Sequence, residues 1–124
     1  MANMETALKE AMQIEGALGV ALVDYNSGMA LGTLGSGKDF DLNVASAGNT
    51  DVVRAEMRTL EMLNLQGEVI EDVLVTLAGQ YHVIRPLTHH GSKGLFLFLA
   101  LNRARANLAF ARHRLARIEE GLEV

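Results

Sequence analysis

The stretch Leu95–Leu101, LFLFLAL, decides the fold. Its leucines alternate with Phe96, Phe98 and Ala100, so a strand here is apolar on both faces. Val20–Val23, VALV, has the same character near the N-terminus. Apolar groups on both faces of a sheet must be covered. We therefore expect an α+β fold in which one five-stranded antiparallel sheet carries helices on both faces.

The rest of the chain supplies the other elements in the order α-β-β-α-β-β-β-α. Apolar periodicity predicts helices over Ala2–Glu15, over Asp41–Leu63 with a kink or restart at Gly48–Thr50, and over Arg103–Glu120. Strands are predicted over Leu18–Tyr25, Met29–Leu34, Asp72–Ala78, Gln80–Leu87 and Leu95–Leu101. Turns at Asn26–Gly28, Gly79 and His89–Gly94 are short, which requires antiparallel neighbours. No linker divides residues 1–124, so we expect a single domain.

Composition narrows the class of protein. The 124 residues are 49% hydrophobic and 21% charged, with a formal net charge of −4 and no cysteine. This argues against nucleic-acid binding and excludes disulfides and thiolate metal sites. The N-terminus lacks a signal-peptide pattern, and the longest apolar run is far shorter than the roughly 20 residues of a membrane span. We expect a cytoplasmic protein that neither inserts into a membrane nor binds nucleic acid.

The segment Gly32–Asp39, GTLGSGKD, nearly matches a nucleotide-binding phosphate loop. Asp39 replaces the Ser or Thr that would bind Mg²⁺, and Asp41 adds a second carboxylate that opposes a phosphate. The pattern around the segment is also antiparallel, whereas the loop belongs to parallel α/β domains. We interpret it as a turn in which Asp39 or Asp41 caps the next helix. A nucleotide contact through Lys38 is the alternative.

The remaining polar residues predict no catalytic site. The four histidines, His82, His89, His90 and His113, lack the spacing of a metal site, and His82 is expected to be an exposed or hydrogen-bonded strand residue. Serines stand in no nucleophile motif, and no acid–base pair is evident. We therefore expect no enzyme activity, no cofactor and no metal.

The second predicted helix carries more apolar surface than one sheet face needs. Its apolar positions cover well over half of the helical wheel: Val52, Val53, Ala55, Met57, Leu60, Met62 and Leu63. Glu56 falls inside this arc, and a narrow polar stripe completes the wheel. Packing on one sheet needs an arc of little more than about 100°. The excess indicates either a homodimer interface or a deeply buried helix of a monomer.

The strand Asp72–Ala78, DVLVTLA, is expected at one edge of the sheet, with neither proline nor lysine to blunt that edge. Pairing with its own copy would make one continuous sheet across a two-fold axis. The predicted dimer interface comprises Val53, Glu56, Met57, Leu60, Val73, Val75 and Leu77. The polar stripe of the second helix, Arg54, Arg58 and Glu61, is predicted to bind a further partner.

The last predicted helix holds most of the basic side chains: Arg103, Arg105, Arg112, His113, Arg114 and Arg117. They lie largely opposite an apolar stripe, which favours a solvated face whose late arginines complement the helix dipole. An acidic protein partner or a membrane surface is the alternative. Glu119 and Glu120 dilute the charge and favour the first interpretation.

Four segments together carry a family resemblance. They are GALGVALVDYNSGMALG in the first hairpin, VLVTLAGQYHVIRPL and GLFLFLALNR in the later strands, and ANLAFARHRLARIE at the end. In the last, the matching residues are Ala106, Asn107, Leu108, Ala111 and Arg112. In order and spacing the chain resembles the roadblock family, which includes a dynein light chain and bacterial GTPase regulators. AGNTDVVRAEMRTLEMLNL is similar to actinobacterial members, which often accompany a small Ras-like GTPase and a sensor kinase.

The resemblance implies a roadblock/profilin-like fold and a non-enzymatic homodimer joined through the second helix and the third strand. It further implies a regulatory or scaffold module of a signalling system that binds a small Ras-like GTPase and modulates its nucleotide cycle. A sensor kinase is a possible additional partner. The alternative is a structural adaptor for a sensor kinase or motor-type complex, without effect on GTP hydrolysis.

Overall fold

The computed structural model describes residues 3–37, 40–88 and 94–123. Its elements follow the predicted order: α1 (Met4–Met12), β1 (Ala17–Asp24), β2 (Met29–Gly35), α2 (Leu42–Met62), β3 (Val73–Thr76), β4 (Gln80–Pro86), β5 (Leu95–Asn102) and α3 (Leu108–Gly121). The five strands form one sheet in the order β2-β1-β5-β4-β3, and every pair of neighbours is antiparallel. This confirms the predicted fold class.

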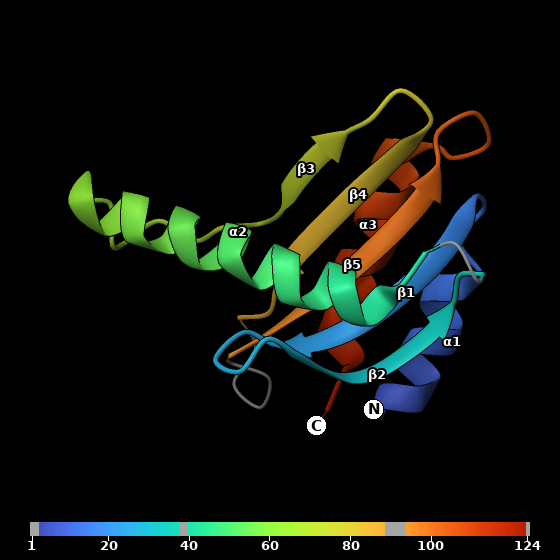
Figure 1. Ribbon diagram of the computed structural model, residues 1–124, viewed down its shortest axis with the longest axis horizontal. Coiled ribbons are helices and arrows are strands. Elements are labelled where there is room, and N and C mark those ends of the chain that lie inside the picture. The colour runs from blue at the N-terminus through green and yellow to red at the C-terminus, as the bar shows by residue number, and fades with distance from the viewer. Residues whose placement is uncertain (1–2, 38–39, 89–93, 124) are drawn as a thin grey trace.

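The sheet is covered on both faces, as Figure 1 shows, with α2 on one face and α1 and α3 on the other. The central strand β5 divides its side chains as predicted. Phe96, Phe98 and Ala100 pack in the cluster under α2, whereas Leu97, Leu99 and Leu101 pack in the cluster under α1 and α3. All six are fully buried. The two apolar faces therefore give the protein two separate hydrophobic layers.

Helix α2 runs without interruption, so the predicted kink at Gly48–Thr50 is wrong. Asp41 caps its start by accepting hydrogen bonds from Asn43 N at 2.8 Å and Val44 N at 3.3 Å. Gly48 lies exposed, and its cost in helix propensity is about 1 kcal/mol. Burial of Thr50 in the next turn holds this part of the helix against the sheet, which offsets that cost.

Helices α1 and α3 are shorter than the sequence indicates. Helix α1 ends at Met12, because the chain then tightens into i→i+3 hydrogen bonds and reaches Gly16, whose φ is +88°. Helix α3 begins at Leu108, not at Arg103. Arg103 N donates to Gly79 O, and Asn107 accepts from Phe110 N as the cap. Arg103 is therefore held by the β3–β4 turn, and the N–H groups of residues 104–106 bond to Asn102.

Across the described ranges, none of the helices combines the length and the apolar character that crossing a lipid bilayer requires.

Candidate functional site: the surface of α2 and β3

The two edges of the sheet differ in how open they are to another strand. β3 is an edge strand, as predicted, although it spans only Val73–Thr76. On the other edge, β2 carries a bulge: Leu22 pairs with Gly32 and Val23 with Ala30, so Leu31 is an extra residue. A bulge twists an edge away from regular pairing. Among the described strands, β3 is therefore the edge better suited to accept another strand.

The interface residues predicted on β3 lie on the face covered by α2. Val73 pairs with Ile84 and packs into the cluster under α2, and Val75 pairs with His82 on the same face. Val73 and Val75 are half-buried. Leu77 follows the strand in the turn to β4 and is 40% exposed. The apolar side chains of β3 are thus only partly covered by the single chain.

The interface residues predicted on α2 lie at different depths. Val53 is fully buried in the protein's own core, so in a dimer it would support the interface from below without contacting the partner. Met57 packs partly into the same cluster, and Leu60 is half-buried. Glu56 is exposed, and none of the ion pairs within the described residues includes it. In the single chain Glu56 is therefore solvated, and it would have to find a partner or stay at the rim if a second copy covered this surface.

The C-terminal half of α2 projects beyond the sheet on the side where β3 begins (Figure 1). Large apolar side chains are exposed there and in the segment that follows: Met62, Leu63, Leu65 and Val69. This explains the excess of apolar positions on the helical wheel. The excess surface is not buried in the single chain, which argues against a deeply buried monomer helix.

A groove of about 610 Å³ lies under this projecting part of α2. Met57, Leu60 and Glu61 line it from the helix, Val69 and Ile70 from the returning segment, and Pro86 to Thr88 from the end of β4. The lining is mostly apolar. The groove therefore continues the apolar surface of α2 toward the sheet.

The polar stripe of α2 is solvent-exposed. Arg54, Arg58 and Glu61 are all exposed, and no ion pair within the described parts of the chain involves them. The stripe thus presents two guanidinium groups and a carboxylate beside the apolar surface. Such an arrangement suits contact with a charged protein surface.

An aromatic cluster lies under the start of α2 and beside β3. The His82 ring contacts Phe98 edge-on at 5.2 Å between centroids and Phe40 at 5.5 Å. His82 Nε2 donates a hydrogen bond of 2.7 Å to Gln80 Oε1, so the predicted hydrogen-bonded strand histidine is confirmed. Burial lowers the pKa of His82 below its ordinary value of 6.5.

The first half of the near-match to a phosphate loop, Gly32–Gly35, lies in β2 and not in the predicted turn, and Ser36 and Gly37 begin the connection to α2. Asp41 is the helix cap, which confirms one of the two aspartates predicted for that role. Lys38 and Asp39 lie outside the described residues, as do His89 and His90. Within residues 3–37, 40–88 and 94–123, no three His, Asp or Glu side chains are grouped as a metal site requires.

The basic side chains of and around α3 form a largely solvated face, as predicted, and two of them also contact the β3 region. Those that are exposed are Arg103, Arg105, Arg112, His113 and Arg117. Arg112 pairs with Asp72 at 2.6 Å, and Arg103 donates to Leu77 O at 3.0 Å while lying 5.4 Å from the centre of the Tyr81 ring. Arg117, by contrast, makes only a loose surface pair with Glu120 at 3.7 Å. Two basic side chains thus bind the β3 region of the same chain.

Comparisons with known proteins bear on the fold. No family model matches the sequence. No curated protein matches it. Solved structures match in shape: a roadblock/LC7 domain from Streptomyces avermitilis has a TM-score of 0.76 at 13% identity, covering 96% of this chain and 93% of its own. Myxococcus xanthus MglB has a TM-score of 0.72 at 19% identity, with coverage of 92% and 77%.

The chain has the roadblock fold. Myxococcus xanthus MglC shares it with a TM-score of 0.57 at 24% identity, covering 94% of this chain and 92% of its own. The family resemblance inferred from the sequence is thereby confirmed at the level of the fold. Sequence identities of 13% to 24% support a shared fold only. The partners and activity of this chain therefore have to be inferred from its own surface.

Sequence reasoning missed the polar contacts around the start of β3. Asp72 and Arg85 were not singled out, and Glu119 was interpreted only as diluting the charge of the last helix, yet all three form ion pairs. The sequence does contain signals for two of these residues. Arg85 stands between Val83 and Leu87 in the apolar alternation of β4, and Glu119 is four residues after the buried Leu115. A charge inside an apolar pattern indicates a buried partner.

Proposed function

We propose that the protein is a non-enzymatic homodimeric regulatory or scaffold module that binds a small Ras-like GTPase and modulates its nucleotide cycle. The main observation that supports the dimer is that β3 is an edge strand without proline or lysine and that the adjacent half of α2 exposes an apolar surface. An open edge offers backbone hydrogen bonds, and the apolar surface offers burial. Both lie on the same side of one chain.

In the proposed dimer β3 pairs with the β3 of a second copy, and α2 packs across the junction. Met57, Leu60, Val73, Val75 and Leu77 would be covered by the partner, with Val53 beneath them. Glu56 would lie at the rim or face a basic side chain of the second copy. One solved structure with this fold is described as MglB with a tetrameric arrangement, which supports self-association as a property compatible with the fold.

The proposed GTPase surface is the polar stripe of α2. Arg54, Arg58 and Glu61 are exposed and unpaired within the described residues, and they border the apolar surface. Charged residues at the rim of an apolar patch steer and orient a protein partner. In this proposal the nucleotide belongs to the GTPase, and the module acts by positioning the GTPase's own groups or by scaffolding it.

The dimer is tested by sedimentation of the wild type and of two variants, Val75→Arg and Leu60→Arg. We expect a wild-type mass of about twice 13.4 kDa. The arginine of Val75→Arg would be buried without a partner, at a cost on the order of 3–5 kcal/mol, or a hundredfold or more in the dissociation constant. Leu60→Arg should weaken the dimer less, because Glu56 lies one helical turn away. Leu31→Arg, on the bulged edge β2, is the matched control and should leave the dimer intact. A monomeric wild type would contradict the dimer.

GTPase binding is tested by pull-down with the small Ras-like GTPase encoded nearest this gene, loaded with GDP or GTP. We expect binding that the double charge reversal Arg54→Glu with Arg58→Glu abolishes, while Arg117→Glu on α3 preserves it. Hydrolysis of GTP by the GTPase should change when the module is added. Absence of binding in both nucleotide states would refute the proposal, and binding with unchanged hydrolysis would favour the structural adaptor.

A further inference from the structure

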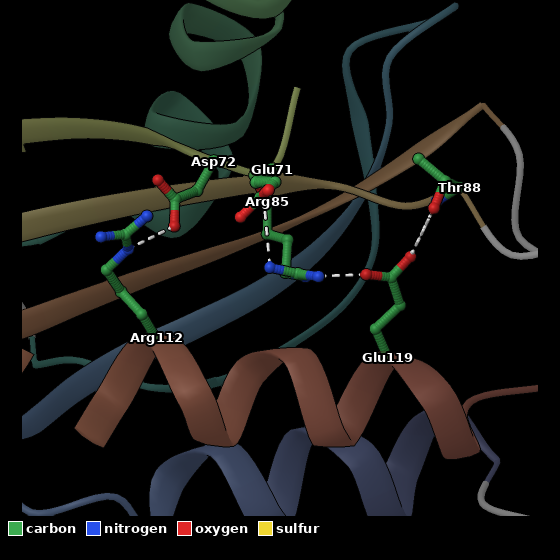
Figure 2. Close-up of polar contacts among 6 residues, drawn as sticks. All are labelled: Glu71, Asp72, Arg85, Thr88, Arg112 and Glu119. Atoms are coloured by element: carbon green, nitrogen blue, oxygen red, sulfur yellow. Dashed lines mark hydrogen bonds and ion pairs between the residues drawn. The ribbon is translucent and has the colours of Figure 1, made fainter. Parts of the chain in front are cut away.

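A network of polar contacts joins α3, the end of β4 and the residues that precede β3 (Figure 2). Its members are Glu71, Asp72, Arg85, Thr88, Arg112 and Glu119. Thr88 is its uncharged member, and Glu71 takes part through its backbone carbonyl. The network lies on the face of the sheet opposite α2. It therefore contacts the β3 edge from the side that the proposed dimer interface leaves open.

The first half of the network is the pair of Arg112 and Asp72. Arg112 Nε lies 2.6 Å from Asp72 Oδ2, although the two residues are 40 apart in the sequence. The Asp72 side chain is only 9% exposed. The hydrogen bond and charge of Asp72 raise the pKa of Arg112 above its ordinary value. The residue directly before β3 is thus tied to α3.

The second half is organised by Glu119, which is 5% exposed. Its Oε1 accepts a hydrogen bond from Arg85 Nε at 2.7 Å, and its Oε2 accepts from Thr88 N at 2.8 Å and Thr88 Oγ1 at 3.3 Å. Arg85 in turn donates from Nη1 to Glu71 O at 3.4 Å. Glu119 therefore holds the end of β4 directly and the approach to β3 through Arg85.

The two halves share one face of α3. Arg112 and Glu119 are seven residues apart, about two helical turns, and both project toward the sheet in Figure 2. Their charges are opposite, and so are those of their partners. Arg112 therefore holds residue 72, and Glu119 holds β4 through Arg85.

The residues that lead into β3 have little other support, although the strand itself is held by β4, by the packing of Val73 and by Arg103 at its end. β3 has four residues, and within the described chain it pairs with β4 alone. The segment between α2 and β3, residues 63–72, contains no helix or strand. Ladder pairing begins only at Val73, opposite Ile84. Residues 71 and 72 are therefore placed by the network and not by the sheet.

We propose that Arg112, with Arg85 and Glu119 behind it, is a positioning residue for the β3 edge. The network sets where β3 begins and so presents Val73 and Val75 at the place where a second copy pairs. This inference rests on the proposed dimer. Arg112 would thus affect dimerisation by placing β3, although Arg112 itself does not contact the second copy.

The test compares Arg112→Ala with Arg117→Ala, which removes an exposed arginine of the same helix. Hydrogen–deuterium exchange should show faster uptake in the peptide spanning residues 71–78 of the Arg112→Ala protein at concentrations where the chains are monomeric. The dimer dissociation constant should rise on the order of tenfold. The urea midpoint of the monomer should fall as well, because the Asp72 side chain, 9% exposed, loses its ionic partner. Arg117→Ala should behave as the wild type in all three measurements. The charge swap Arg112→Asp with Asp72→Arg should restore protection and dimerisation.

The outcomes separate this inference from the proposed function. Exchange of residues 71–78 that is unchanged in Arg112→Ala overturns the positioning role, even if the wild type dimerises. Faster exchange with an unchanged dissociation constant also overturns it, because β3 would then be loosened without consequence for pairing. A wild type that stays monomeric refutes the dimer, whereas the exchange measurement still reports whether the network holds β3.

Discussion

Truncating Glu119 to alanine tests how the buried ion pair contributes to stability. The carboxylate is 5% exposed and accepts from both Arg85 and Thr88. Its removal leaves the Arg85 guanidinium, on a side chain that is 18% exposed, without its ionic partner. Removing one member of a buried pair costs about 3–5 kcal/mol. Because Arg85 keeps some contact with water and with Glu71 O, we expect the lower end, about 3 kcal/mol.

The expected change in melting temperature follows from the length of the chain. An unfolding entropy of about 2.1 cal/mol/K per residue gives roughly 0.26 kcal/mol/K for 124 residues. A loss of about 3 kcal/mol therefore lowers the melting temperature by about 11 °C. Calorimetry at one fixed protein concentration measures this, since dimerisation makes the melting temperature depend on concentration.

Two further variants show whether the reasoning holds. Glu120→Ala removes the neighbouring exposed carboxylate, 3.7 Å from Arg117, and should cost no more than about 1 kcal/mol. The double variant Arg85→Met with Glu119→Leu replaces both charges by apolar groups and should recover most of the loss. If Glu119→Ala costs less than Glu120→Ala, or if the double variant is as unstable as the single one, the pair is not buried as described.

Other predictions concern pH, backbone and nucleotide. Burial lowers the pKa of His82 below 6.5, so the unfolded chain takes up a proton first as the pH falls, and stability should drop as the pH falls through about 6.5 and below. His82→Gln should flatten this dependence in urea titrations, with exposed His113→Gln as control. Gly35→Ala should destabilise by about 1–3 kcal/mol, because Gly35 has φ +83° and a Cβ would lie 2.9 Å from Leu18 O. Gly48→Ala, with open space around it on α2, should stabilise by about 0.5–1 kcal/mol in thermal melts of the monomer. Titration of ATP and GTP should show no binding, and a micromolar affinity lost in Lys38→Ala would restore the phosphate-loop interpretation.

Several features of the site could be predicted because they are local. The alternation of side chains in Leu95–Leu101 predicts a strand that is apolar on both faces. The helical spacing of apolar residues in α2 predicts more apolar surface than one sheet face can cover. Asp41 before Leu42 predicts a cap that needs only its own backbone neighbours. Even the edge position of β3 followed from short connections and the order of the strands.

The predicted start of α3 and the predicted kink in α2 were wrong because contacts with distant parts of the chain decide the conformation of these residues. Arg103–Ala106 continue a helical pattern, yet α3 starts later because Arg103 is bonded to Gly79 and Leu77 in the β3–β4 turn. Gly48 predicts a kink, yet packing of the flanking turns carries α2 through it. In both cases tertiary contacts outweigh a local preference of about 1 kcal/mol or less.

The sequence by itself determined the sheet, the faces that helices must cover and the apolar excess on α2, because these depend on the period at which apolar residues recur. Only the tertiary structure decided that Arg112 binds Asp72, that Arg85 binds Glu119, and that β2 is bulged while β3 stays open. The reason is physical. A charged side chain takes its partner from whatever the packed elements bring within a few ångströms, and that distance is set by the fold as a whole and not by spacing along the chain.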